Sequence, residues 1–119
     1  LTNDILEHPN AVEIFTLART IEDARIERIM EQEYPETAVI FKERAQYIIP
    51  VYKGHNPTPF SKIVDDLFLY LRGYSKSFSG PKEYIDIAQQ FIAAGNDRDK
   101  KVETIIKLGE VITKDLKMS

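Results

Sequence analysis

The densest group of residues that could carry chemistry is a run of acids and bases in the first quarter of the chain. It reads Glu22-Asp23-Ala24-Arg25-Ile26-Glu27-Arg28 and lies inside a stretch of helical periodicity. Asp23 and Glu27 are four residues apart, so on a helix their carboxylates share one face. Two carboxylates on one face suit a divalent metal or an acid–base pair. The same spacing suits a solvated face with i,i+4 ion pairs worth about 0.3–0.5 kcal/mol each, and this plainer interpretation is the more common one.

Three arginines accompany these carboxylates. Arg19 reaches the face of Asp23 from the preceding turn, while Arg25 and Arg28 share a face with each other. Glu22 falls on nearly the same side of the helix as Ile26 and Ile29, so we expect it to be drawn toward other helices. An unpaired buried charge is costly, so Arg25 or another cation should compensate it. The run therefore predicts a networked cluster of Glu22, Asp23, Arg25 and Glu27.

The other residues with catalytic potential are few and far apart. His8 and His55 are the only histidines, the chain has no cysteine, and no His-Glu-x-x-His motif occurs. This excludes disulfides, thiolate zinc sites and a complete zinc hydrolase site encoded in this chain. We expect His8 to precede a helix and His55 to lie in a turn, and we expect no catalytic or cofactor-binding residue here.

Composition narrows the class of partner. The 119 residues carry 16 Lys+Arg and 19 Asp+Glu, a net charge of −3, and 43% of them are hydrophobic. A mildly acidic chain is a poor nucleic-acid binder, since phosphate contacts need clustered Lys and Arg. No apolar run approaches the roughly 20 residues that cross a bilayer, so no membrane partner is expected. The lack of a membrane-spanning run and the absence of cysteine together predict a cytoplasmic location.

The elements that must position these residues are predicted to be helices. Proline and glycine separate five segments of helical periodicity, over Pro9–Gln32, Pro35–Ile49, Phe60–Arg72, Pro81–Ala94 and from Asp97 or Asp99 to Lys117. Pro50 should close the second helix, and Gly73 and Gly95 should end the next two. We therefore expect an all-α fold, a single five-helix, bundle-like domain over residues 1–119. Because the chain begins at Leu1 without a methionine, we also expect it to be a fragment of a longer protein.

Periodicity also predicts which apolar residues are buried. In the first helix the recurring positions are Val12, Phe15, Ile26, Ile29 and Met30, with Ile14, Leu17, Ala18 and Ile21 between them. In the second helix the expected core residues are Val39, Ile40, Tyr47 and Ile48.

The first helix also carries a family resemblance. The segment from Ile14 to Met30, followed by Tyr34-Pro35, resembles part of the cobaltochelatase T-subunit-like proteins. These proteins carry a von Willebrand factor A domain and also occur in phages. The matching residues are Glu22-Asp23, Arg25-Ile26-Glu27 and Tyr34-Pro35.

This resemblance implies a helical accessory domain that assembles with a protein partner, an AAA-type ATPase, and is not catalytic by itself. In the family a His-Glu-x-x-His-like helix lies upstream of the acidic helix. The resemblance then makes Glu22, Asp23 and Glu27 candidate positions at a divalent metal of the full-length protein, with Arg25 orienting a carboxylate. Two alternatives stay open. The chain could be part of a zinc-metallopeptidase-like domain with further ligands before Leu1, or a free-standing helical phage adaptor.

Overall fold

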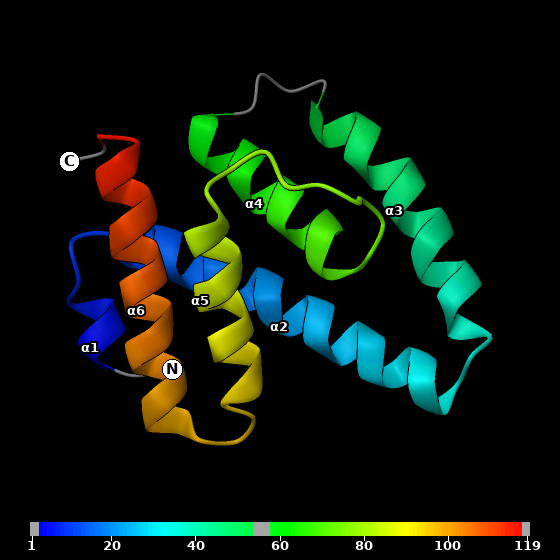
Figure 1. Cartoon of the computed structure of the whole chain (residues 1–119), viewed down its shortest axis with the longest axis horizontal. Coiled ribbons are helices and arrows are strands. Elements are labelled where there is room, and N and C mark those ends of the chain that lie inside the picture. Colours follow the sequence, from blue (N-terminus) through cyan, green and yellow to red (C-terminus); the bar gives the residue numbers. More distant parts are fainter. Residues whose placement is uncertain (1–2, 54–57, 118–119) are drawn as a thin grey trace.

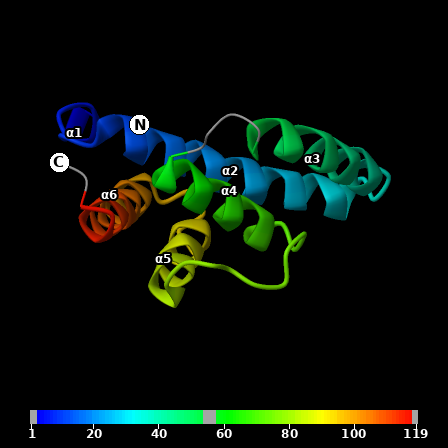
Figure 2. The same cartoon turned by 90° about the horizontal axis from the view of Figure 1, so that it is seen from above.

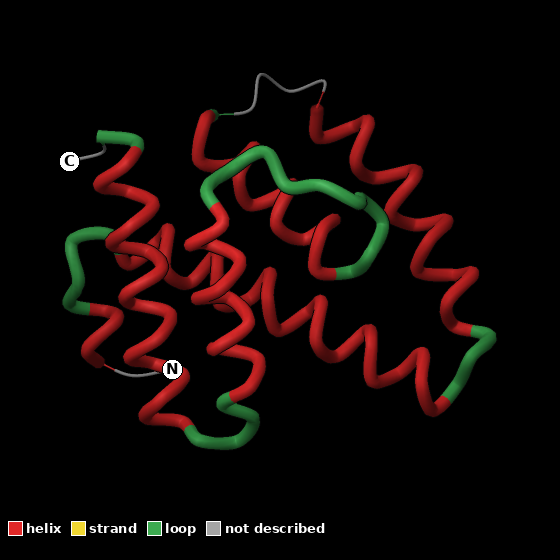
Figure 3. The backbone as a smooth tube through the Cα atoms, in the orientation of Figure 1, coloured by secondary structure: helices red, strands yellow, loops and turns green. Residues whose placement is uncertain are grey.

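The computed structural model describes residues 3–53 and 58–117, and the side chains of 5–46 and 58–117. The chain forms six helices, α1 (Asn3–Leu6), α2 (Ala11–Glu33), α3 (Thr37–Lys53), α4 (Pro59–Leu71), α5 (Lys82–Ala93) and α6 (Arg98–Asp115) (Figure 1). No strand occurs among the described residues (Figure 3). The prediction of an all-α fold is confirmed: the five expected helices are α2 to α6, and α1 is a single additional turn before them.

The long helix α2 organises the core. Its buried residues are Ile14, Leu17, Ala18, Ile21 and Ala24, and this face packs against α4, α5 and α6. Helices α5 and α6 pair along their lengths, and α4 and α5 lie on the same side of α2 (Figure 2). α6 comes especially close to α2 at Gly109, where an added Cβ would lie 2.5 Å from Ile14 Cγ1. The small residues Gly109, Ala18 and Ala24 thus let the helices approach.

Helix ends follow the local chemistry of the sequence. Thr58 caps α4, since its Oγ1 accepts a hydrogen bond from the Ser61 backbone N–H at 3.1 Å. Asp97, and not Asp99, caps α6 in the same way, through the N–H of Lys100 at 3.1 Å. Gly73 and Gly95 follow α4 and α5 with φ values of 77° and 60°, the left-handed backbone that favours glycine at a helix end.

The buried stripe of α2 differs from the one expected. Val12 is 75% exposed, and Ile26, Ile29 and Met30 are also exposed, while Phe15 is partly buried. The other helices pack against the side of α2 that contains the alanines, which leaves the apolar residues elsewhere on the helix exposed. The helix also begins at Ala11, after Asn10, so Pro9 lies before it and not in its first turn.

α3 also departs from expectation. The break at Tyr34-Pro35 is present, but α3 begins at Thr37 and continues past Pro50 to Lys53. Proline lacks a backbone N–H, so Pro50 removes one hydrogen bond from the ladder of α3 without ending the helix. The expected burial of Val39 and Ile40 is wrong, with 62% and 61% of their surface exposed.

The reason for this exposure is the position of α3. It packs mainly against α2, so only one of its faces is covered. Among the described side chains of α3, the half-buried ones are Thr37, Ala38, Phe41 and Ala45. The side chains of Tyr47 and Ile48, also expected in the core, lie outside the described side chains, and His55 lies outside the described residues. No helix in the described ranges combines the length and apolar character needed to cross a membrane.

Candidate functional site

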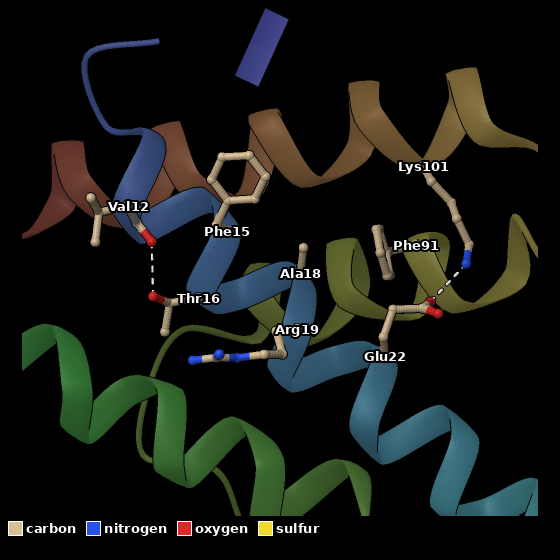
Figure 4. A pocket seen from close by; sticks show the side chains of 8 residues that line it. All are labelled: Val12, Phe15, Thr16, Ala18, Arg19, Glu22, Phe91 and Lys101. Atoms are coloured by element: carbon tan, nitrogen blue, oxygen red, sulfur yellow. Dashed lines mark hydrogen bonds and ion pairs between the residues drawn. The ribbon is translucent and has the colours of Figure 1, made fainter. Parts of the chain in front are cut away.

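A pocket of about 560 Å³ opens beside α2, next to α5 and the first turn of α6 (Figure 4). It is lined by Val12, Phe15, Thr16, Ala18, Arg19, Glu22, Phe91 and Lys101. The aromatic rings of Phe15 and Phe91 and the small side chain of Ala18 give it an apolar floor. Arg19, Glu22 and Lys101 place charges around it. An apolar hollow with a few charged groups at its edge suits the insertion of an apolar side chain from a partner.

Glu22 is the centre of an ion cluster at the edge of this pocket. Arg25 donates two hydrogen bonds to its carboxylate, from Nε to Oε1 at 3.1 Å and from Nη2 to Oε2 at 2.9 Å. Lys101 Nζ on α6 donates to Oε1 at 2.7 Å, and it lies 5.2 Å from the centre of the Phe91 ring. Figure 4 shows Glu22 and Lys101 pointing toward each other across the pocket edge. The expected inward turn of Glu22 and its pairing with Arg25 are present, and α6 supplies a second cation.

These contacts set the protonation of Glu22. Partial burial raises the pKa of its carboxyl, but the hydrogen bonds from Arg25 and Lys101 outweigh burial, so the pKa is lowered below 4.5. Glu22 is therefore held as a carboxylate with both oxygens occupied by cations. A metal at Glu22 would first have to displace these cations.

The remaining acids of the run do not join this cluster. Asp23 is exposed, and Glu27 points to a different cation, Arg72 at the end of α4, with Oε1 3.1 Å from Nε. The single network predicted for Glu22, Asp23, Arg25 and Glu27 is therefore not formed. Glu22 and Arg25 belong to one cluster, Glu27 belongs to another, and Asp23 belongs to neither. Within the described part of the chain, no group of three His, Asp or Glu side chains is close enough to hold a metal ion.

The basic residues of the run also separate. Arg19 is exposed and extends away from the Glu22–Lys101 pair in Figure 4. Neither Arg19 nor Asp23 forms a salt bridge with any side chain in the described ranges, although they are four residues apart on one helix. Arg28 instead donates from Nη1 to the Leu71 carbonyl at 2.7 Å and so satisfies a carbonyl in the last turn of α4.

Arg72, like Lys101, is a charged residue whose role was not predicted from the sequence. Its side chain is fully buried between α2 and the end of α4, where Nη2 hydrogen-bonds Glu31 and the Tyr74 hydroxyl, the latter at 2.7 Å. Its guanidinium also lies 5.0 Å from the Tyr74 ring centre and 5.6 Å from that of Phe41. The only hint in the sequence is its place before Gly73, because cations favour the last turn of a helix.

Burial controls the pKa values around Arg72. It raises the pKa of Glu27, against the opposing effect of Arg72, and Asp23 and Glu31 raise it further. Burial also raises the pKa of the Tyr74 hydroxyl, so this group stays a neutral hydrogen-bond partner at pH 7. The cluster joins α2, α3 and α4, and its contacts explain how the C-terminal half of α2 is held.

His8 lies where the sequence predicts it, in the turn before α2. Its Nδ1 accepts a hydrogen bond from the Asn10 backbone N–H at 3.0 Å, and its Nε2 lies 3.3 Å from Glu110 Oε1 on α6. These contacts tie the start of α2 to α6, which is a structural role for this histidine.

Comparison of the sequence and structure with known proteins does not assign the chain to a family. No family profile, no curated protein and no solved structure matches the chain.

Proposed function

We propose that this chain is a helical assembly domain that binds another protein chain through the exposed side of α2. The observation that carries the proposal is the set of large apolar side chains that α2 leaves exposed, with Val12 beside the pocket and Ile26, Ile29 and Met30 near the end of the helix. Large apolar side chains left in water on a long helix are typical of a protein–protein contact. The pocket beside Val12 supplies the recess into which an anchor residue of the partner fits.

The resemblance to cobaltochelatase T-subunit-like proteins extends this proposal. The motif of Glu22-Asp23, Arg25-Ile26-Glu27 and Tyr34-Pro35 supports a place in a cytoplasmic assembly with an AAA-type ATPase. In that setting the domain contributes contacts, and the chemistry belongs to other parts of the assembly. Exposed Val39 and Ile40 on α3 offer a further apolar surface for such a partner.

Site-specific photo-crosslinking tests the docking role. A benzophenone amino acid at Val12 is expected to give covalent adducts with a protein chain in cells that make this protein, because Val12 is exposed and lines the pocket. Mass spectrometry identifies the adduct. Adding Ile26→Asp to the same chain should abolish it, because a charge then replaces an exposed apolar side chain of the docking surface.

The matched control places the same group at Lys107, which is exposed on α6. The proposal is wrong if Val12 gives no protein adduct, or if its adducts equal those of Lys107 and persist with Ile26→Asp. An adduct with an AAA-type ATPase would support the assembly that the resemblance suggests.

A further inference from the structure

We propose that the partner seated on the exposed side of α2 is a second copy of this chain, whose α2 packs antiparallel to the first. This inference rests on the proposed docking role and names its occupant. It starts from the outer stripe, which we define as Val12, Thr16, Arg19, Asp23, Ile26 and Met30. The intervals between these residues alternate between four and three, which is the spacing of a helix–helix seam.

The outer stripe is self-complementary when reversed. In an antiparallel pair centred on the turn of Ile21, Val12 faces Met30 of the second copy, Thr16 faces Ile26, and Arg19 faces Asp23. Each of these three facing pairs occurs twice in the dimer, once on either side of the two-fold axis. Val12 and Met30 therefore form an apolar contact at each end of the pair, and each central charge meets a charge of the opposite sign.

The two central charges give the strongest argument for this arrangement. Arg19 and Asp23 are exposed, and neither has a salt bridge among the described side chains. A second copy in this register supplies Asp23 to Arg19 and Arg19 to Asp23. In a parallel pair, Arg19 would face Arg19 and Asp23 would face Asp23, which is unfavourable. Charge thus selects the antiparallel pair over the parallel one.

The pocket lies near the beginning of α2, and most of the exposed apolar residues lie near its end. This distribution also favours an antiparallel pair. The pocket borders Val12 and Phe15 near the beginning of the helix, whereas exposed Ile26, Ile29 and Met30 lie near its end. Reversal brings the end of one α2 onto the beginning of the other. Met30 of each copy then lies beside the pocket of its partner. From Val12 to Met30 the seam is about 27 Å long at the 1.5 Å rise of an α-helix.

Charge reversal provides the test. With Arg19→Asp, two aspartates face each other across the seam, and with Asp23→Arg, two arginines do. Each variant alone is expected to weaken dimerisation at least about tenfold, measured by sedimentation equilibrium. Mixing the two variants should restore a dimer with one copy of each, because every central layer then joins opposite charges. Circular dichroism checks that both variants keep the fold.

The controls carry the same changes in net charge on a different face. Lys107→Asp and Glu103→Arg lie on exposed positions of α6 and are expected to leave dimerisation unchanged, alone and mixed. The self-pairing is wrong if the unaltered chain sediments as a single copy up to about 1 mM, a concentration at which even weak pairs associate. It is also wrong if the single reversals leave the dimer intact, or if mixing fails to restore it. If the chain is a single copy while Val12 still crosslinks to another protein, only the choice of occupant fails and the docking role stands.

Discussion

At the scale of single residues, Glu22 shows how the pocket edge depends on protonation. Replacing it with Gln keeps its shape but removes the charge that Arg25 and Lys101 bind, so we expect a loss of about 1 kcal/mol in unfolding free energy at pH 7. Urea unfolding measures this loss. Glu103→Gln on the exposed side of α6 is the matched control and should change stability by less than half as much.

The same residue predicts a dependence on pH. The pKa of Glu22 is lower in the folded chain than its ordinary value of 4.5, because hydrogen bonds to Arg25 and Lys101 outweigh burial. Its stabilisation is therefore complete above pH 4.5 and is lost as the pH falls through the lower folded pKa. The difference in unfolding free energy between the unaltered chain and Glu22→Gln should shrink in that window. A difference that stays constant down to pH 3 would contradict the assigned contacts.

Arg72 is the residue with the largest expected effect on stability. Arg72→Met leaves Glu31 and Glu27 without their cation, so we expect a loss of about 3 kcal/mol or more. Adding Glu31→Gln and Glu27→Gln to Arg72→Met should recover part of this loss, because no uncompensated acid then remains. Thermal unfolding compares the stability of Arg72→Met with that of the triple variant. If the two are equally stable, the carboxylates of Glu27 and Glu31 do not need Arg72 as their cation.

At the scale of elements, the approach of α6 to α2 depends on Gly109. Gly109→Ala places a methyl group 2.5 Å from Ile14 Cγ1 and is expected to cost about 1–2 kcal/mol, despite the better helix propensity of alanine. The same substitution in an Ile14→Ala background should cost less, since the clashing atom is gone. A double-mutant cycle in urea measures the difference, and full additivity of the two changes would contradict the close approach.

The elements also show what the sequence could and could not predict. Gly73 and Gly95 end α4 and α5 as predicted, and Asp97 is one of the two caps expected for α6, because these ends follow local chemistry. The cap of α4 at Thr58 was not predicted, since this helix was expected to begin at Phe60. The buried side of α2 was not predictable, because apolar residues occur on both of its sides and periodicity alone cannot say which side the other helices cover. Arg72 was missed for a related reason: its partners Glu27 and Glu31 are distant in sequence and meet it only after α2 and α4 pack.

At the scale of the whole molecule, the core face and the outer face of α2 have different roles. One face packs against α4, α5 and α6, while the outer stripe carries the opposite charges of Arg19 and Asp23 together with the exposed apolar residues Val12, Ile26 and Met30. This division lets changes to the outer stripe alter assembly with little effect on folding. Ile26→Gln should therefore weaken the dimer while changing the monomer's unfolding free energy by no more than about 0.5 kcal/mol, as judged by sedimentation and by urea unfolding at low concentration.

Cysteine crosslinking tests the antiparallel pairing of α2 most directly, because the chain has no cysteine of its own. A chain carrying both Val12→Cys and Met30→Cys should form a covalent dimer on mild oxidation, since the antiparallel register places these two positions face to face. The chain with Val12→Cys alone should not, because its two cysteines would lie about 27 Å apart, far beyond disulfide reach. A covalent dimer from Val12→Cys alone, or none from the double variant, would contradict the antiparallel pairing of α2.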